Sequence, residues 1–320
     1  MTTPEMPSLP APPRGFVARE PADVLAVVPL LLGFEPEDCV VMMTFGAEHQ
    51  FHARLDLPPA GATDTEVAQV AALLVEPAVR HHVTGVLLVF YSDDAERARR
   101  SARCLVDAFG AAGIAVLDAI RADGQRHWPA TGPGEGTAYD VSAHPVRAQA
   151  VLDGHVTRRS RAELAATLDP DDRGRADVAR ALEHRSALAA DEVSALLLGC
   201  LATGSAPGAD EVAGLVRAVA DPVVRDVAWL GMTRHDADRH VALWSDVVRR
   251  TPDEWLPGAA AVLGFAAWLS GSGALAWCAV DRCLAVDPDH VLGGYVGQLL
   301  ERAVPPQAWA DAGAGAGRPA

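Results

Sequence analysis

The pattern of apolar residues along the first part of the chain predicts four β-strands. Two continuous apolar runs, at Cys39–Phe45 and residues 83–91, are typical of strands that are buried on both faces. Residues 51–57 and 114–120 are the other two predicted strands. The short polar turn at residues 46–49 joins the first two strands into a hairpin.

Helices are predicted between these strands, where apolar residues recur every three or four positions. This spacing covers residues 63–76 and 93–110. A further helix is predicted before the first strand, at residues 21–32, because Pro21 lies near its start and Gly33 at its end. Pro77 is expected to end the second helix, since proline lacks the amide hydrogen that a helix needs. Asp93 is expected to cap the start of the third helix.

The order of these elements indicates an α/β N-terminal domain followed by an all-α domain of helical hairpins. A strand–helix–strand succession predicts a parallel pair, and the hairpin adds antiparallel pairing, so residues 21–128 should form a mixed sheet with helices packed on it. A Gly- and Pro-rich loop at residues 129–143 is the predicted linker. Residues 144–309 are helical in pattern, and residues 1–20 and 310–320 are expected to be disordered.

The helical part shows a possible repeat of the tetratricopeptide kind. Leu-Gly pairs begin at Leu198, Leu230 and Leu263, and a proline follows each pair. Small residues at such positions let two antiparallel helices approach closely. Irregular helix packing is the open alternative, because a chain rich in Leu and Gly contains such pairs by chance.

Composition narrows the classes of function. The chain has 320 residues and a net charge of −15, contains no lysine and no asparagine, and is acidic in both halves. An acidic balance disfavours nucleic-acid binding, and a chain without lysine has neither a Schiff-base nor a P-loop lysine. The missing residue types have AT-rich codons, so a GC-rich genome is the expected source.

Three features of the sequence favour a cytoplasmic location. The five cysteines contain no Cys-x-x-Cys pair, and their number is odd, which suits a reducing compartment. The N-terminus lacks the basic and then apolar pattern of a signal peptide. The longest apolar run, at residues 24–33, is too short to span a bilayer, so no membrane partner is expected.

One polar cluster has the residue types of a metal site without the spacing. His235, Asp236, Asp238 and His240 lie in the segment RHDADRH. Two histidines four residues apart share a helix face, whereas the five-residue separation here turns them apart. A solvated polar turn is the favoured interpretation.

Three other segments resemble ligand-binding loops only in part. Asp169, Asp171 and Asp172 lack the glycine and the distal glutamate of a calcium loop, and a helix N-cap is favoured. The glycine-rich segments 132–136 and 271–273 do not follow a buried strand with dinucleotide spacing. The second of them is interpreted as a turn between two helices.

A basic stretch on the third helix is interpreted as a solvated face with ion pairs rather than an RNA contact, because neighbouring acids offset it. Its members are Arg97, Arg99, Arg100 and Arg103.

Few side chains suggest catalysis. His81 and His82 follow a predicted helix end, where histidine is favourable, and lack a visible catalytic partner. Cys39 follows acidic residues, which disfavour a reactive thiolate. Trp128, Tyr139 and His144 flank the predicted linker, where aromatic residues either line a pocket or pin two domains together; pinning is favoured. No catalytic, cofactor-binding or metal-binding residue is assigned.

Several segments together resemble an uncharacterised actinobacterial domain-of-unknown-function family (the DUF-4192 type). They are DVLAVVPLLLGFEPEDCVVMM at 23–43, ARLDLP at 53–58, HPVRAQAVLDG with SRAELAATLDPDD at 144–172, and AWLSGSGALAWCAVDRCLAVDPDHVL at 267–292. The resemblance spans most of the chain and implies no activity. Members often carry a Cys-rich stretch where this chain has HWPATGPGEG at 127–136, so a metal or redox role there is not expected.

Three functions follow as hypotheses. The favoured one is a non-enzymatic interaction or regulatory protein with a protein partner or self-association, since the helical hairpins suit such contacts. The alternative is a small-molecule-binding protein or new enzyme, its site near residues 91–94 and 119–123 facing the loop 129–143. A structural subunit is the third, because the apolar tracts 259–269 and 291–300 could be covered by another copy.

Overall fold

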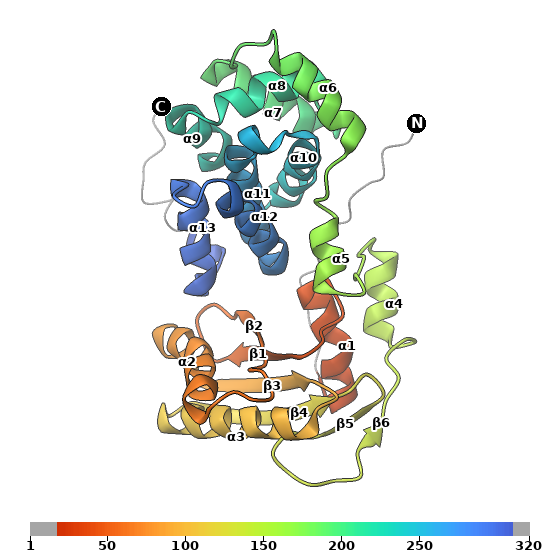
Figure 1. The fold of residues 1–320 in the computed structure, drawn as a ribbon. Coiled ribbons are helices and arrows are strands. Elements are labelled where there is room, and N and C mark those ends of the chain that lie inside the picture. Colours follow the sequence, from red (N-terminus) through yellow and green to blue (C-terminus); the bar gives the residue numbers. More distant parts are fainter. Residues whose placement is uncertain (1–17, 310–320) are drawn as a thin grey trace. The chain divides into compact units, whose positions relative to one another are not determined.

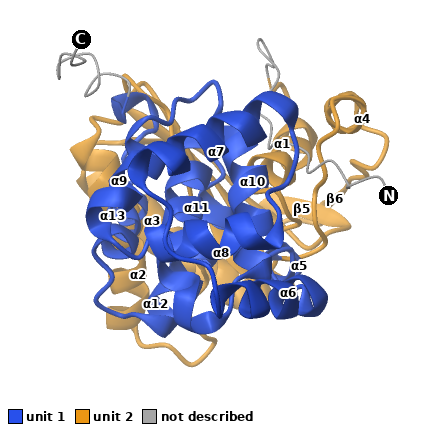
Figure 2. Ribbon diagram, turned by 90° about the horizontal axis from the view of Figure 1, so that it is seen from above, with its two compact units in different colours: residues 1–9, 161–320 blue, residues 10–160 orange. Residues whose placement is uncertain are grey.

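The computed structural model describes residues 18–309 and divides into two compact units (Figures 1 and 2). We call residues 18–160 the N-terminal unit and residues 161–309 the C-terminal unit. Residues 1–17 and 310–320 lie outside the described part, so the lead expected at residues 1–20 is described only for its last three residues, and the tail is not described.

The N-terminal unit is built on one six-stranded sheet of order β2-β1-β3-β4-β5-β6. Strand β3 pairs antiparallel with β1 and parallel with β4, so the predicted mixed sheet is confirmed. The strands are β1 (Cys39–Phe45), β2 (His52–Asp56), β3 (Gly85–Tyr91), β4 (Ala115–Ala122), β5 (Arg126–Pro129) and β6 (Thr137–Ala138).

Four helices accompany the sheet in this unit. Helix α3 forms the crossover from β3 to β4 and packs on both strands and on α2, while α1 packs against α4 (Figure 1). The helices are α1 (Pro21–Leu32), α2 (Asp64–Arg80), α3 (Ala95–Ala111) and α4 (Pro145–Leu152). The crossover between parallel strands is the one that the sequence predicted.

Two helix boundaries differ from the sequence prediction. Helix α2 continues through Pro77 to Arg80. The hydrogen bond that proline cannot donate would have gone to the carbonyl of Leu73, whose side chain is 58% exposed, so water can replace it. The N-cap of α3 is Asp94 rather than Asp93, and its side chain accepts from the amides of the second and third residues that follow.

The boundary between the units also differs from the expected linker at residues 129–143. The chain divides after Ser160, because β5 and β6 extend the sheet into that loop and α4 is anchored to the N-terminal unit. The anchors are a hydrogen-bonded pair between His144 and Asp23, at 3.0 Å, and an ion pair between Arg147 and Glu35.

The C-terminal unit is all helical, and its other helices pack around α11. Thirteen of the fifteen residues of α11 are buried, and it packs against α9, α10, α12 and α13. The elements are α5 (Arg161–Ala166), α6 (Asp172–Leu182), α7 (Ala190–Thr203), α8 (Ala209–Ala218), α9 (Pro222–Leu230), α10 (Ala237–Arg250), the 3-10 helix η1 (Asp253–Trp255), α11 (Leu256–Ser270), α12 (Gly273–Val286) and α13 (Val291–Glu301).

The last helical hairpin has the close packing that a repeat of small residues predicts. An added methyl group on Gly264 of α11 would lie 3.2 Å from Val280 of α12 and 3.6 Å from Val296 of α13. Helix α6, however, packs on both α8 and α10, whereas repeats of a linear stack contact only their neighbours. The presence of tetratricopeptide-like units in the helices before α11 therefore stays a prediction.

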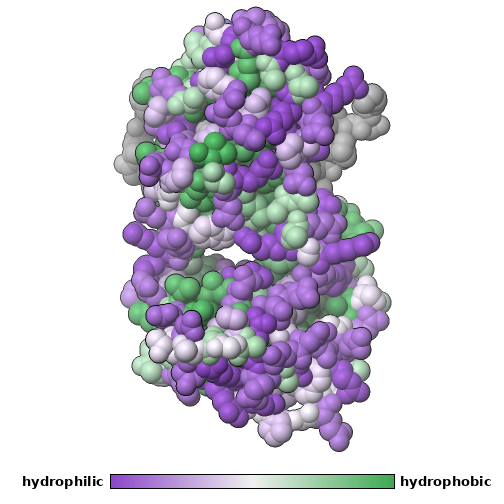
Figure 3. Space-filling model, viewed as in Figure 1, coloured by the Kyte–Doolittle hydropathy of each residue, from purple (hydrophilic) through white to green (hydrophobic). Residues whose placement is uncertain are grey.

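The apolar tract at residues 259–269 is covered by helices of its own chain, so it does not need a second copy. Polar residues cover most of the face of each unit that Figure 3 shows, and apolar patches interrupt them. Among residues 18–309, every helix is too short or too polar to cross a bilayer.

Gly258 of α11 allows a test of how closely this helix packs on its neighbours. A methyl group added there would lie 2.7 Å from the carbonyl oxygen of Val219, whereas one added to Gly199 of α7 would meet nothing within 4 Å. We expect Gly258→Ala to lower the free energy of unfolding by about 1–3 kcal/mol. Gly199→Ala should raise it by about 0.5–1 kcal/mol, because alanine is the better helix former.

Chemical denaturation of both variants, monitored by the helical signal in circular dichroism, measures these changes. Equal stability of the two variants would show that α11 does not pack as closely on the segment after α8 as the structure indicates.

Candidate functional site

The topology of the sheet brings three strand ends to one edge. The parallel strands β3 and β4 end at Tyr91 and Ala122, which are paired with each other. Because β1 runs antiparallel to β3, its first residue, Cys39, also lies opposite Tyr91. The segment before β1 and those after β3 and β4 therefore meet at this edge, where open α/β sheets commonly bind ligands.

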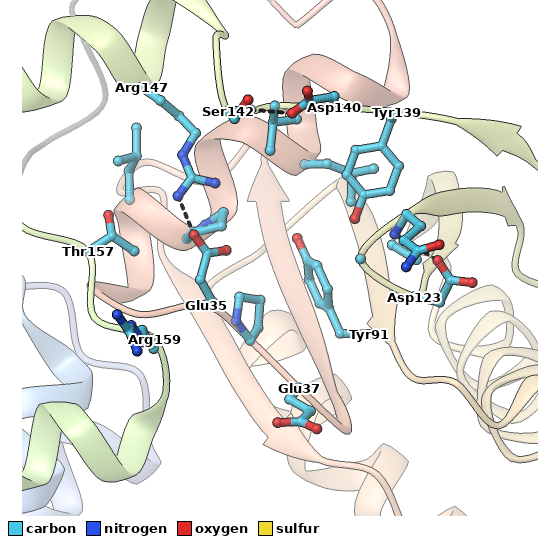
Figure 4. A pocket seen from close by; sticks show the side chains of 18 of the residues that line it. Glu35, Glu37, Tyr91, Asp123, Tyr139, Asp140, Ser142, Arg147, Thr157 and Arg159 are labelled. Carbon is cyan, nitrogen blue, oxygen red and sulfur yellow. Dashed lines mark hydrogen bonds and ion pairs between the residues drawn. The ribbon is translucent and has the colours of Figure 1, made fainter.

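A cavity of about 1130 Å³ lies at this edge, within the N-terminal unit (Figure 4). Its floor is formed by Tyr91 and the residues beside the strand ends. Helices α1 and α4, the segment at residues 139–142 and the segment after α4 form the remaining walls. We call this cavity the strand-edge pocket.

Tyr91 is the most unusual residue of the strand-edge pocket. Its side chain is 7% exposed, and its buried hydroxyl forms no hydrogen bond with residues 18–309. Burial, together with the neighbouring Tyr139, holds the pKa of this phenol well above its usual range, so it stays protonated at neutral pH. In Figure 4 the hydroxyl ends of Tyr91 and Tyr139 point toward one another. The structure thus directs an unsatisfied donor and acceptor into the pocket.

Tyr139 is held by the short pairing beyond β6. Its amide donates to the carbonyl of Gln125 at 3.0 Å. Burial also raises the pKa of this half-buried phenol. The next residue, Asp140, accepts from the amide of Ser142 at 2.8 Å, which shapes the turn into α4.

The segment before β1 is fixed by ion pairs and backbone bonds. Glu35 pairs with Arg147 of α4, and its amide donates to the carbonyl of Arg158 at 2.8 Å. The segment after α4 is thereby fastened to the segment before β1. Arg147 and Glu35 both line the strand-edge pocket (Figure 4).

Asp38 is held in a left-handed conformation beside the pocket. Its φ of 45° is unusual for a residue other than glycine, although aspartate tolerates it better than most. The carboxylate accepts from the hydroxyl of Ser92 at 3.0 Å and pairs with Arg97 at 3.0 Å. Arg97 also donates to the carbonyls of Leu57 and Pro58, at 2.8 and 2.6 Å. These contacts fasten β1, β2 and α3 together at the strand ends.

The other side chains that the sequence raised as candidates have structural roles. Among residues 18–309, no group of three or more His, Cys, Asp or Glu side chains is placed to hold a metal ion. His235 is exposed and His240 is buried, so they face apart as predicted. The solvated turn that the sequence favoured is wrong for Asp238 and His240, which lie in α10. Asp171 caps α6 by accepting from the amide of Gly174 at 3.2 Å, which agrees with the N-cap interpretation.

The two glycine-rich segments are turns. In the segment 132–136, a methyl group on Gly136 would lie 2.3 Å from Trp128, so the glycine allows the indole to pack against the loop. Gly271 has a φ of 88° and ends α11, and residues 271–273 turn the chain into α12 as predicted.

Three arginines of α3 form ion pairs, as predicted, but only Arg99 pairs within the helix, and Arg97 is largely buried rather than on a solvated face. Arg97, Arg99 and Arg100 pair with Asp38, Glu96 and Asp64, respectively.

Cys39 and His81 occupy packed positions. Burial raises the pKa of the Cys39 thiol to about 11, so it is not a nucleophile at neutral pH. The ring of His81 packs edge-on against Phe51, with ring centroids 5.3 Å apart.

The aromatic residues near the expected linker have separate roles within the N-terminal unit. Trp128 lies under the guanidinium of Arg121, 3.7 Å from the ring centroid. His144 pairs with Asp23. Tyr139 alone lines the strand-edge pocket, as the pocket alternative predicted.

Sequence reasoning predicted the pocket edge and missed several of its walls. Residues 91–94 and 119–123 were expected there, and Tyr91, Ala122 and Asp123 line the pocket. Glu35 and Arg147 were missed, although one signal existed. An antiparallel neighbour of β3 must begin where β3 ends, so the residues before β1 belong to the same edge.

Two tyrosine variants test the state of the Tyr91 hydroxyl. Tyr91→Phe removes a buried group that has no partner, so it should raise the free energy of unfolding by about 1 kcal/mol. Tyr139→Phe removes the hydroxyl of a half-buried side chain, so it should change that free energy by less than about 0.5 kcal/mol. Urea denaturation measures both, and a loss of stability in Tyr91→Phe would mean that its hydroxyl has a partner in the protein.

Asp23 tests the anchoring of α4 through pH. Backbone hydrogen bonds, first from Arg19 and then from Glu20, and the bond to His144 hold the pKa of Asp23 below its ordinary 3.8. A carboxyl group whose pKa is lowered by folding stabilises the protein at pH values above its ordinary pKa. This stabilisation is lost as the pH falls through the pKa of the group in the folded protein. Asp23→Asn should therefore be less stable than the wild type at neutral pH, by about 1 kcal/mol, and the gap should close in acid.

Thermal unfolding from neutral pH down to below pH 3.8 measures the difference in stability between Asp23→Asn and the wild type. Glu48→Gln, in the exposed turn after β1, is the control for removing one carboxylate. A gap that stays constant with pH would contradict the role given to the Asp23 carboxylate.

Comparison with known proteins agrees with the resemblance seen in the sequence. Residues 21–307 match the family described as "Domain of unknown function (DUF4192)". No curated protein and no solved structure matches the chain. The match covers α1 through α13 and includes every wall of the strand-edge pocket. Because the matched region is far more than half of its length, the chain belongs to the DUF4192 family of domains of unknown function.

Proposed function

We propose that this protein binds a small organic molecule in the strand-edge pocket. The observation that supports the proposal is the buried hydroxyl of Tyr91, which is directed into a cavity and has no partner within residues 18–309. A polar group left unsatisfied in a protein interior costs about 1–3 kcal/mol, and a ligand that bonds to it removes that cost.

The place and size of the cavity support the same proposal. It lies at the carboxyl ends of the parallel strands β3 and β4. Its volume of about 1130 Å³ is slightly above the common range of about 300–1000 Å³ for small-molecule sites, so it has room for such a ligand. The walls combine apolar side chains with a few polar ones, as such sites usually do.

We propose binding rather than catalysis because the groups beside the cavity are in unreactive states. Burial raises the pKa of the Cys39 thiol to about 11 and raises that of the Tyr91 phenol further above neutrality. Arg147 and Glu35 neutralise each other in an ion pair. A general base would need a pKa near the working pH.

A second candidate is the interaction or regulatory protein that the sequence favoured, with the C-terminal unit as the binding surface. Its support is one face of α9, where Val223, Val227 and Leu230 are 76%, 39% and 52% exposed. Their spacing places them along one side of the helix. A larger assembly is the third proposal, supported by Val291 and Tyr295 on α13, which are 78% and 41% exposed.

The setting that we propose is the cytoplasm of a bacterium with a GC-rich genome, such as an actinobacterium. All five cysteines are free thiols, which suits a reducing compartment. The absence of lysine and asparagine supports the GC-rich source.

Native mass spectrometry of the protein purified gently from its own host tests the proposal. We expect the mass of one chain plus that of a small molecule. Ala148→Trp places an indole at the pocket wall and should abolish the added mass, whereas Leu152→Trp, on the same helix outside the pocket, should retain it.

A chain without any added mass, or an added mass that survives Ala148→Trp, would contradict binding in the pocket. A mass of two chains, or of the chain with another protein, would support the second or third candidate.

A further inference from the structure

Acidic side chains dominate the charged part of the strand-edge pocket. Six carboxylates and two guanidinium groups line it. The carboxylates are those of Glu35, Glu37, Asp38, Asp93, Asp123 and Asp140. Such an excess of negative charge attracts positive ligands and repels negative ones.

Four of these carboxylates already have partners. Glu35 and Asp38 pair with arginines, Asp123 accepts from two backbone amides, and Asp140 accepts from one. Glu37 and Asp93 form no hydrogen bond or ion pair with any residue in the described range 18–309. Two carboxylates without a hydrogen-bonded partner are therefore available to a ligand, and one of them, Asp93, also interacts electrostatically with Arg121.

The Tyr91 hydroxyl is a second and independent indication. It is nine-tenths buried, directed into the pocket and without a partner in the described residues (Figure 4). Its oxygen accepts a hydrogen bond, and ionised carboxylates only accept. A group that bonds both to the carboxylates and to the Tyr91 oxygen must donate hydrogen bonds, and ammonium and guanidinium groups only donate. The rings of Tyr91 and Tyr139 add faces that attract cations.

Part of the pocket lining is apolar. Leu25, Pro29 and Leu30 of α1 lie there, together with Val151 of α4 and Val156 after it. Apolar surface of this kind accepts a hydrocarbon portion of a ligand and gains from removing it from water.

We propose that the strand-edge pocket binds an amphipathic organic cation, a primary amine or guanidinium compound with an apolar portion. The cationic head lies against Tyr91, the unpaired carboxylates of Glu37 and Asp93 attract it, and the apolar portion contacts apolar residues of α1 and α4. This inference rests on the proposed ligand-binding function and names the chemical class of the ligand.

A matched series of six-carbon probes tests the class of ligand. Hexylammonium, 1-hexanol and hexanoate have the same apolar chain with a positive, neutral or negative head. Isothermal titration of the full chain at low salt should show hexylammonium binding at least about tenfold more tightly than the other two. Its affinity should fall as salt rises, because salt screens the attraction.

Variants locate the binding. Tyr91→Phe and the double variant Glu37→Gln with Asp93→Asn should each weaken hexylammonium binding by about tenfold, the factor expected for hydrogen bonds to a charged group. Glu48→Gln removes one carboxylate at the other end of β1 and should leave the affinity unchanged. Ala148→Trp should abolish binding, whereas Leu152→Trp should not.

The outcomes separate this inference from the proposed function. Tighter binding of hexanol or hexanoate, with loss in Ala148→Trp, would overturn the cation proposal and leave ligand binding intact. Binding of none of the three probes would also overturn it, and the native mass spectrum would then decide the proposed function alone. Equal weakening by Glu48→Gln and by the double variant would show a general charge effect, which overturns the inference too.

Discussion

The pairing of β3 with two neighbours of opposite direction is the constraint on which the candidate site depends. Tyr91 lies opposite Cys39 on the antiparallel side and opposite Ala122 on the parallel side. Side chains alternate between the faces of a strand, so a slip of one residue would turn Tyr91 to the other face. The continuous apolar sequences of β1 and β3 keep both strands buried in the interior of the sheet. The geometry of the pocket is thus a consequence of packing in the sheet.

Around this fixed edge, polar contacts position the remaining walls. Arg97 holds Asp38 and the carbonyls after β2, Arg147 holds Glu35, and His144 holds Asp23. Each contact joins segments that are distant in sequence. Within this ordered frame the Tyr91 hydroxyl stays unsatisfied. A local cost that the surrounding structure maintains is typical of functional positions, because it is recovered only when a ligand binds.

The sequence predicted most elements and only part of the site, for physical reasons. Strong apolar runs made β1 and β3 easy to predict, and the strand–helix–strand order gave the parallel pair. The short strands β5 and β6 carry few apolar residues, so the loop at residues 129–143 was interpreted as a linker although it extends the sheet. Arg147 was missed because α4 is short. Its apolar contact with α1, through Val146 and Ala150, and the ion pair between Arg147 and Glu35 leave no long periodic pattern in the sequence. The edge near Tyr91 was predictable, since topology alone places it.

The central claim is that a ligand completes the hydrogen bonding of Tyr91. A crystal structure of the protein purified gently from its own host, at a resolution that shows ordered solvent, tests it most directly. The account predicts a non-protein molecule in the strand-edge pocket, with a donor group within hydrogen-bond distance of the Tyr91 Oη and an apolar portion along α1 and α4. A Tyr91 hydroxyl bonded to another protein group, in a pocket filled only with water, would contradict it.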